Sequence, residues 1–316
     1  MTSLPLRRLG TSDLHVFPLG LGGNVFGWTA DATQSFAVLD AYTAAGGNFV
    51  DTADTYSSWA PGHQGGESET VIGDWMAARG NRSDVIVATK VGGHPQYKGI
   101  GATTIKAAAE QSLRRLRTDY IDLYYTHVDD PAVPVEEFVS ALDQLVREGK
   151  VRAVAASNIS AERLQEALDF SAREGLASYV ALQPHYSLVS RDTYEGALRD
   201  TAERAGLSAV PYWALASGFL TGKYRPGTQV DSARAEGAAK HLATERGREV
   251  LAALDTIAGA RGIEVSSVAL AWLAAQPTVA APLASARTVE QLPPLLASAE
   301  LALTADELAL LTAASA

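Results

Sequence analysis

The chain contains no cysteine and no long apolar run, and its basic residues are fewer than its acidic ones. The absence of cysteine among 316 residues excludes disulfides, thiolate nucleophiles and Cys-ligated zinc or iron–sulfur centres. No segment approaches the roughly 20 apolar residues of a membrane-spanning helix, and the first ten residues lack an apolar stretch of signal-peptide length. The sequence therefore predicts a cytoplasmic protein without a membrane anchor.

The charge balance also limits the partners. With 26 Lys and Arg against 36 Asp and Glu, the formal net charge is −10, which repels nucleic acid and anionic membrane surfaces. We therefore expect no nucleic-acid or membrane partner, and any bound phosphate must be held by local basic or backbone groups. A hydrophobic content of 47% and a charged content of 20% are typical of a globular protein with a substantial core.

Short apolar runs alternate with amphipathic segments along the whole chain. Eight such strand-helix pairs are expected: 17–20 with 31–45, 48–50 with 67–78, 85–89 with 103–116, 120–126 with 135–148, 151–155 with 160–173, 180–182 with 193–204, 208–212 with 265–274, and 278–283 with 288–297. Alternation of this kind favours a parallel sheet. It predicts one (β/α)8 TIM barrel domain over residues 1–316, with a doubly wound open sheet as the alternative.

Two segments fall outside this alternation. Residues 221–244 are rich in Gly, Arg and Ala and are expected to form a long surface loop, which after a late strand often covers a ligand. The tail from residue 301 begins with a capping-box pattern, Thr304 with Glu307, and predicts a C-terminal helix.

Five polar residues stand where successive apolar runs end: Asp51, Lys90, His127, Asn158 and Gln183. In a parallel barrel the carboxyl ends of the strands meet at one rim, and polar residues there are usually functional. The pattern therefore predicts a site built on this rim.

Proton-transfer chemistry is the first interpretation of these residues. Tyr56 lies five residues beyond Asp51, so one loop could bring its phenol over the barrel mouth. A phenol is a weak acid at neutral pH unless a cation stabilises its anion, and Lys90 on the next strand could supply that cation. Asp51 would keep Lys90 charged, and His127 could bind the substrate oxygen or share the proton. Structural ion pairs and aromatic packing are the alternatives, and a Schiff-base reaction through Lys90 is a further one.

Ordered motifs along the chain resemble those of the aldo-keto reductases, over nearly the whole length. They lie at residues 6–10, 50–56, 88–90, 122–127, 156–158 and 217–224. By this resemblance Asp51, Tyr56, Lys90 and His127 form the catalytic tetrad, with Tyr56 as the general acid in carbonyl reduction. The resemblance also implies hydride transfer from NADPH to a small carbonyl substrate, with no metal ion.

The same resemblance implies where the cofactor binds. Ser157, Asn158 and Gln183 would surround the nicotinamide amide, and Tyr212 would lie against the ring face. Arg287 would contact the 2′-phosphate near the start of helix 288–297, which favours NADPH over NADH. The further expected cofactor residues are Ala214, Leu215, Ser217, Gly218, Lys223, Ser285 and Gln291.

Some positions depart from the family pattern or leave alternatives open. Ala284 and Leu295 are apolar where the family commonly has Gly and a polar residue, which bears on the adenine contacts. Some members of the family act mainly as regulatory partners, so a cofactor-sensing subunit is a second hypothesis. Substrate and oligomeric state stay open. The substrate pocket is expected to include Trp28, Trp59, His94 and Trp213.

Overall fold

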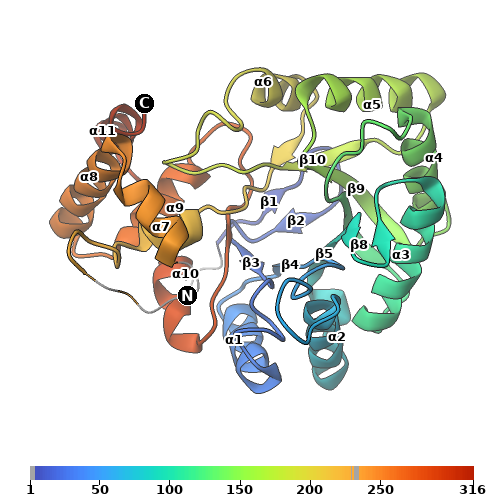
Figure 1. Cartoon of the computed structure of the whole chain (residues 1–316), viewed down its shortest axis with the longest axis horizontal. Coiled ribbons are helices and arrows are strands. Elements are labelled where there is room, and N and C mark those ends of the chain that lie inside the picture. Colours follow the sequence, from blue (N-terminus) through green and yellow to red (C-terminus); the bar gives the residue numbers. More distant parts are fainter. Residues whose placement is uncertain (1–3, 229, 231–234) are drawn as a thin grey trace.

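A computed structural model describes residues 4–228, 230 and 235–316, and its centre is a parallel sheet that closes into a barrel (Figure 1). The sheet order is β11-β10-β9-β8-β5-β4-β3-β12, and every pairing in it is parallel. Its strands are β3 (Gly20–Gly22), β4 (Phe49–Asp51), β5 (Ile86–Val91), β8 (Ile121–Thr126), β9 (Val151–Ser157), β10 (Tyr179–Gln183), β11 (Ser208–Ala209) and β12 (Leu283–Ala284).

Residues 278–284 close the ring, because they bond to strands on both sides. The Ala209 amide donates to the Thr278 carbonyl at 2.8 Å, and the Ala280 amide donates back to Ala209 at 2.9 Å. Four residues later, β12 pairs with β3. The structure thus confirms the (β/α)8 barrel and excludes the open sheet.

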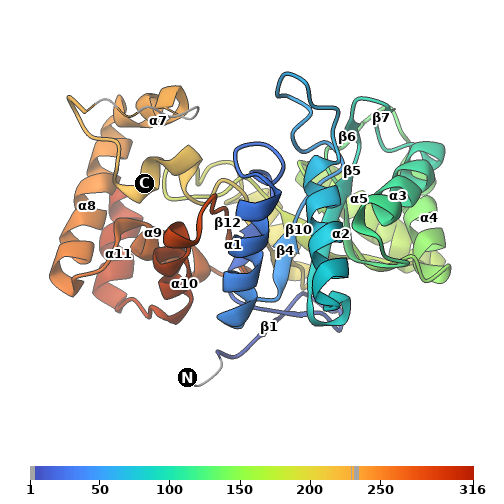
Figure 2. The same cartoon turned by 90° about the horizontal axis from the view of Figure 1, so that it is seen from below.

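Helices cover the outside of the barrel (Figures 1 and 2). Those in the repeating units are α1 (Ala32–Ala44), α2 (Glu67–Arg79), α3 (Ala102–Leu116), α4 (Val135–Arg147), α5 (Ala161–Glu174), α6 (Ala197–Arg204), α9 (Val265–Ala274) and α10 (Leu292–Glu300). Local signals fix several of their ends. Asp31 caps α1 in a capping box with Gln34, and Ser160 caps α5 through the Arg163 amide.

An antiparallel hairpin of β1 (Arg7–Arg8) and β2 (His15–Val16) closes the end of the barrel where the strands begin. The Gly10 amide donates to Ser208 Oγ at the start of β11, and the Phe17 amide donates to Asn48 Oδ1 just before β4. Leu9, Leu14 and Val16 belong to the same buried cluster as the inward-facing strand residues. The hairpin does not cover the opposite end of the barrel, where the strands finish, and the candidate active site lies there.

Several expected boundaries are wrong: the strands expected at 208–212 and 278–283 are Ser208–Ala209 and Leu283–Ala284 in the structure. Three other boundaries differ for a local reason. The first strand is Gly20–Gly22 rather than 17–20, since Pro18 has no amide to give to a ladder. Helix α6 begins at Ala197 rather than at 193, because Gly196 has φ 97° and ψ −140°, which no helix contains. The expected helix 288–297 begins as a 3-10 turn (Val289–Gln291), and α10 itself starts at Leu292.

The segment 221–244 is only partly irregular, which corrects the expected surface loop. It contains α7 (Ala235–Leu242), whose exposed Glu236 and Lys240 form an i,i+4 ion pair of 3.1 Å. Ala238 is fully buried on the other side of the helix, which packs against the 3-10 segment η2 (Ala216–Thr221). Residues 229 and 231–234 lie outside the described residues.

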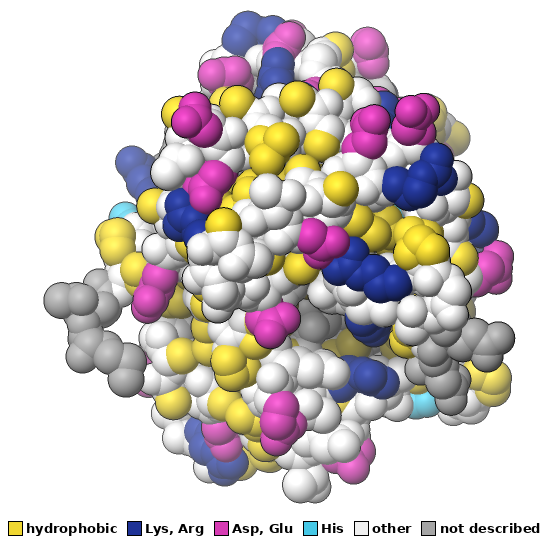
Figure 3. All heavy atoms as spheres, turned by 90° about the vertical axis from the view of Figure 1, so that its left-hand side faces the viewer, with side chains coloured by type: hydrophobic (Ala, Val, Ile, Leu, Met, Phe, Trp, Pro, Cys, Tyr) yellow, Lys and Arg dark blue, Asp and Glu magenta, His cyan; other side chains and the backbone are white. Residues whose placement is uncertain are grey.

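The last part of the chain adds helices to one side of the barrel. Helices α8 (Glu245–Arg261), which was not predicted, and α11 (Ala305–Ala314) pack side by side, at the left in Figure 1. The capping box of Thr304 and Glu307 starts α11 as predicted. Figure 3 shows this face, where acidic and basic side chains are interspersed with apolar ones.

No single helix in the described ranges is long and apolar enough to span a membrane. Of the described helices, only α8 and α9 taken together, bent by 106°, reach such a length and composition.

Candidate active site

The centre of the barrel mouth is a buried ion pair. Asp51 ends β4 and Lys90 lies on the neighbouring β5, so the two side chains enter the mouth from adjacent strands. Lys90 Nζ lies 2.7 Å from Asp51 Oδ2 and donates a second bond of 2.7 Å to the Thr52 carbonyl. Both side chains are almost completely buried, with exposures of 0% and 1%. Burial lowers the Lys90 pKa, and the Asp51 carboxylate opposes this effect.

Tyr56 completes a three-residue cluster with this pair. Lys90 Nζ donates to the Tyr56 hydroxyl at 2.9 Å, and that hydroxyl donates to Asp51 Oδ2 at 3.2 Å. Burial raises the pKa of the Tyr56 phenol well above its usual value, and the negative charge of Asp51 adds to the shift. The phenol therefore stays protonated at neutral pH and can give up its proton only to a strong base, such as a developing alkoxide.

His127 stands beside the phenol as a neutral ring. The Tyr56 and His127 ring centroids are 6.2 Å apart at an interplanar angle of 73°. Burial, with a contribution from the Lys90 charge, lowers the His127 pKa to about 3. Among the described residues no group bonds to its buried Nδ1 atom. A neutral imidazole can donate a hydrogen bond to a substrate oxygen, but it has no extra proton to transfer. His127 can therefore orient the oxygen, whereas Tyr56 can protonate it.

Four residues from the opposite side of the mouth join this cluster through hydrogen bonds. The Tyr212 hydroxyl donates to Asn158 Oδ1 at 2.8 Å, and Asn158 Nδ2 donates to Ser157 Oγ at 3.0 Å. Ser157 Oγ donates to the Gln183 carbonyl at 2.9 Å, and Gln183 Nε2 donates to Asp51 Oδ1 at 2.8 Å. The side chains expected near the nicotinamide are thereby continuous with the expected catalytic group.

Backbone strain is concentrated around the same mouth. Among the described residues, seven other than glycine have positive φ angles, and five of them are a predicted site residue or its direct neighbour: Ser57 (76°), Asn158 (49°), Trp213 (54°), Ala216 (47°) and Ser217 (57°). Left-handed backbone costs an ordinary residue of order 1–2 kcal/mol, and such strain tends to occur at functional sites. The surrounding structure therefore holds these side chains in positions that the local chain would not adopt alone.

The expected phosphate side of the site is more open. Arg287 is exposed, and its guanidinium makes no hydrogen bond or ion pair with the described residues. Its backbone amide donates to Gln291 Oε1 at 2.9 Å, and Ser285 Oγ donates to Asn24 Oδ1 at 2.6 Å. The helix that was expected to begin beside Arg287 starts four residues later, so the helix-dipole argument for an anion does not apply here. Leu295 is buried in the core.

The loop after β11 carries the remaining expected cofactor residues. Ala214 is buried, and the Leu215 carbonyl accepts the Gly218 and Leu220 amides at 2.9 and 3.2 Å. The exposed Lys223 ammonium lies 5.0 Å from the centroid of the Tyr224 ring. Short-range backbone hydrogen bonds hold this loop in place. Its Lys223 makes no ion pair with a described residue.

The residues expected in the substrate pocket lie in three different places. Trp59 meets the Tyr56 ring at 6.0 Å and so lies beside the phenol, and Trp28 meets Trp59 edge to face at 5.5 Å. Trp213 is 57% exposed and meets the His185 ring, which itself stacks on Tyr212. His94 is only 5% exposed, under the backbone of Gly65, and accepts the Gln96 amide on Nδ1. The structure therefore does not bring His94 into the open mouth.

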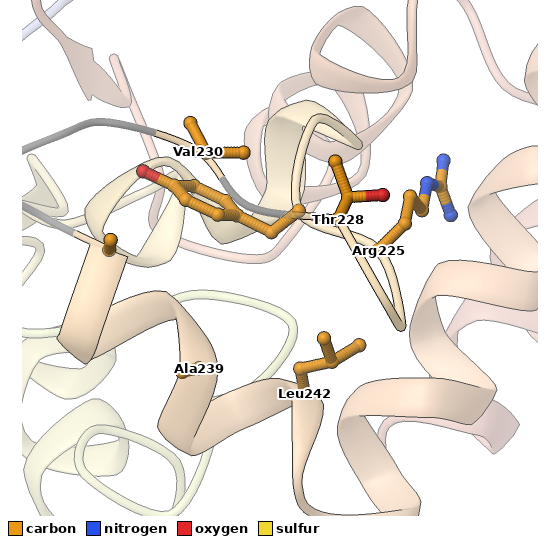
Figure 4. Close-up of a pocket in the computed structure, with 7 residues that line it drawn as sticks. Arg225, Thr228, Val230, Ala239 and Leu242 are labelled. Atoms are coloured by element: carbon orange, nitrogen blue, oxygen red, sulfur yellow. The ribbon is translucent and has the colours of Figure 1, made fainter.

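A separate cavity of about 550 Å³ lies between α7 and the loop that precedes it (Figure 4). None of the four expected catalytic residues lines it. Its lining consists of Tyr224, Arg225, Thr228, Val230, Ala235, Ala239 and Leu242.

Sequence reasoning missed a layer of buried charge beneath the cluster. Glu69 is fully buried and accepts bonds from Thr89 Oγ1 at 2.5 Å and from Arg115 Nε at 2.6 Å. Asp54 is also fully buried. A signal was available, because Glu69 stands three and seven residues before the apolar Ile72 and Met76, on the same face of the helix. Its helical spacing places a carboxylate in the core, which requires a partner.

Comparison with known proteins identifies the family to which this chain belongs. The sequence profile described as "Aldo/keto reductase family" matches residues 18–316. The chain belongs to this family. It is 32% identical to Protein tas of Escherichia coli K12, over 96% of this chain and 95% of that protein. It is 31% identical to Norsolorinic acid reductase B of Aspergillus parasiticus, over 97% and 84%. It is 33% identical to a probable voltage-gated potassium channel subunit beta of rice (Oryza sativa subsp. japonica), over 90% and 88%.

Membership of the aldo/keto reductase family confirms the resemblance seen in the sequence. It makes the protein an oxidoreductase of a family that uses a nicotinamide cofactor.

Proposed function

We propose that this aldo/keto reductase reduces an aldehyde or ketone to an alcohol, with NADPH as the hydride donor and Tyr56 as the proton donor. The observation that carries the proposal is the pair of short contacts from Lys90 Nζ, 2.7 Å to Asp51 and 2.9 Å to the Tyr56 hydroxyl. They place a charged ammonium against a phenol that is protonated at neutral pH. That combination suits transfer of a proton to an oxygen as negative charge develops on it.

When bound, NADPH supplies a hydride to the carbonyl carbon. As the C=O double bond becomes a single bond, the Tyr56 O–H bond breaks and its proton passes to the substrate oxygen. The Lys90 ammonium stabilises the phenolate that is left, and Asp51 holds that ammonium in place. Neutral His127 would donate a hydrogen bond to the same substrate oxygen and thereby orient it.

The residues at the mouth fit a nicotinamide. Asn158 has a left-handed backbone that its neighbours enforce, and its amide links Tyr212 to Ser157. The flat Tyr212 ring is half-exposed and could lie against a flat heterocycle. The open Arg287 guanidinium could fork onto a 2′-phosphate, which is the basis for preferring NADPH. The substrate would contact Trp28, Trp59 and Trp213, which border the mouth.

The test is NADPH consumption by the wild type and by Tyr56→Phe, across a panel of aromatic, aliphatic and sugar-derived carbonyl compounds. Phenylalanine keeps the ring but removes the acid. We expect turnover to fall by several orders of magnitude, since general acid catalysis alone contributes about 10²–10⁴-fold, while NADPH binding stays nearly intact. Full activity of Tyr56→Phe would remove Tyr56 from its role.

A second candidate is a cofactor-sensing subunit with little turnover. It is favoured by the 33% identity to a protein named as a probable potassium channel subunit beta. Tight NADPH binding without turnover on any substrate of the panel, together with a stable protein partner, would support it. A Schiff-base enzyme is disfavoured, because the Asp51 carboxylate at 2.7 Å keeps the Lys90 amine protonated. We also propose a cytoplasmic location, from the composition of the chain.

A further inference from the structure

Asp54 is a buried carboxyl group that the proposed reaction does not use. It lies in the loop that carries Tyr56 and is fully buried. Its backbone amide donates to the carbonyl of Lys90 at 3.3 Å, so the residue is attached to the backbone of the central lysine. Neither of its carboxyl oxygens has a hydrogen-bond partner among the described residues.

The loop that carries Gly65 packs closely against the backbone of Asp54. Gly65 has φ +100°, and a Cβ atom there would lie 2.9 Å from the Asp54 carbonyl and 2.9 Å from His94 Cδ2. Only a glycine allows this close approach. The loop therefore lies directly against the Asp54 backbone, and the Asp54 side chain is fully buried.

Four charged or titratable groups from other elements act on Asp54. Glu69 on α2 is a buried carboxylate, and Arg115 on α3 and Lys90 on β5 are cations. Tyr124 on β8 is within range of the Asp54 charge, and its own pKa is raised mainly by burial. His94, which shares the cover of Gly65, is a neutral ring because burial lowers its pKa.

The charges around Asp54 balance without it. Asp51 with Lys90 forms a buried pair, and Glu69 forms a second pair with the partly buried Arg115; each pair has zero net charge. An ionised Asp54 would add one buried negative charge that the nearby Thr55 amide offsets only in part, and an unpaired buried charge is among the most costly arrangements in a protein. A neutral carboxyl is much less costly in the same position.

We propose that Asp54 is a positioning residue that keeps its proton at neutral pH and loses it under mildly alkaline conditions, when the added charge beneath Lys90 makes Tyr56 a weaker acid. Ionised Asp54 would disfavour the phenolate that forms as Tyr56 gives up its proton. The proposed reduction would then slow as the pH rises. This catalytic consequence depends on the proposed function, whereas the protonation of Asp54 does not.

The alkaline range follows from burial and from the Glu69 charge, which together raise the Asp54 pKa to about 8, with Arg115 and Lys90 offsetting them only in part. In the unfolded chain the same group ionises near pH 4. Between these values the native state holds a proton that the unfolded state has lost, so folding stability falls as the pH rises toward 8.

The first experiment needs no substrate. The thermal unfolding midpoints of the wild type and Asp54→Asn are measured from pH 5 to pH 9, with exposed Asp74→Asn as the control. We expect the difference between Asp54→Asn and the wild type to grow in favour of the variant up to about pH 8 and then level off. The difference for Asp74→Asn should stay nearly constant. Parallel curves for Asp54→Asn would overturn the proposal.

If Asp54→Asn does not fold, the carbon-13 shift of the Asp54 carboxyl in the wild type gives the same answer. A protonated carboxyl at pH 7 that titrates near pH 8 supports the proposal, and an ionised one at pH 7 overturns it.

The second experiment tests the link to the reaction through the ratio of the two turnover rates. The rate of Asp54→Asn divided by that of the wild type should rise by up to about tenfold from pH 6 to pH 9, as nine-tenths of Asp54 ionises one unit above its pKa. A constant ratio, with the unfolding result as expected, would remove the positioning role but leave the protonation intact. No turnover by either protein would count against the proposed function instead.

Discussion

The two sides of the barrel mouth are built in opposite ways. On the side of Asp51, Lys90 and Tyr56, the side chains come from strand ends or the loop beside them and are joined by bonds of 2.7 to 3.2 Å. On the side of Arg287 and Lys223, the side chains lie in exposed loops and make no ion pair within the described part of the chain. The chemistry is therefore positioned by the fold itself, whereas phosphate binding depends on loops.

The difference has a physical reason. A buried ammonium and carboxylate are tolerated only in close contact, so burial enforces their geometry. An exposed guanidinium is solvated and has many rotamers of similar energy, and a ligand must order it. Substitutions on the side of Asp51, Lys90 and Tyr56 should accordingly lower stability and turnover. Substitutions on the side of Arg287 and Lys223 should lower cofactor affinity.

The largest effect is expected from Lys90→Met. It leaves the Asp51 carboxylate buried without its cation, which costs about 3–5 kcal/mol of folding free energy. It should also lower turnover by about a thousandfold, within the range of general acid catalysis. Chemical denaturation and NADPH oxidation measure the two effects. Lys150→Met, at a partly exposed pair with Glu110, is the control and should change stability by less than about 1 kcal/mol. Equal losses in both variants would contradict the contrast.

Arg287→Ala tests the exposed side. If the guanidinium makes a charge-assisted hydrogen bond to the 2′-phosphate, its loss should weaken NADPH binding by about 1.5–3 kcal/mol and leave NADH binding nearly unchanged. Fluorescence titration with both cofactors measures the difference, and Arg173→Ala on the surface of α5 should alter neither affinity. Equal weakening for both cofactors would refute the 2′-phosphate contact. Unfolding free energy should not change.

Acid should destabilise the buried side through His127. Its pKa is lowered by burial and by Lys90 to about 3, whereas in the unfolded chain it titrates near 6.5. The contribution of neutral His127 to stability is fully present above its pKa in the unfolded chain. It declines as the pH falls from about 6.5 toward 3, because in that range only the unfolded chain takes up a proton. The slope from this group approaches about 1.4 kcal/mol per pH unit.

His127→Gln should remove that contribution to the slope in unfolding experiments from pH 4 to pH 7. His15→Gln, an exposed histidine of the hairpin at the other end of the barrel, is the matched control. A slope that is unchanged in His127→Gln would show that the ring titrates normally.

The smallest effect is expected from relief of strain on the loop side. Ser217 has φ 57°, and Ser217→Gly should stabilise the protein by about 1 kcal/mol or less, since glycine has no penalty there but loses more chain entropy on folding. Arg117→Gly, at φ 54° after α3 and away from the mouth, should give a similar gain. Only Ser217→Gly should weaken NADPH binding. If both variants keep wild-type affinity, the strain at Ser217 has no role in the site.

The sequence predicted the regular parts of this protein well, because their signals are local. Helix 265–274 was predicted at its observed bounds, the predicted capping box at Thr304 starts α11, and the predicted helix start at Asp31 is the N-cap of α1. Helix α7 was missed because its Gly-containing, Ala-rich turns resemble a loop until Ala238 is buried against η2. The start of α10 was misplaced because a 3-10 turn precedes it, and its two prolines fall in its first turn, where proline is tolerated.

For the site, the sequence alone determined which residue types stand at the strand ends, since alternating strands and helices bring those ends to one rim. It could thus predict Asp51, Tyr56, Lys90 and His127 as neighbours. Only the tertiary structure decided which hydrogen bonds join them, that Gln183 bonds to Asp51, and that His94 is covered while Arg287 is open. It alone also placed Asp54 and Glu69 beneath Lys90, because burial and charge balance depend on residues from distant elements that no local pattern brings together.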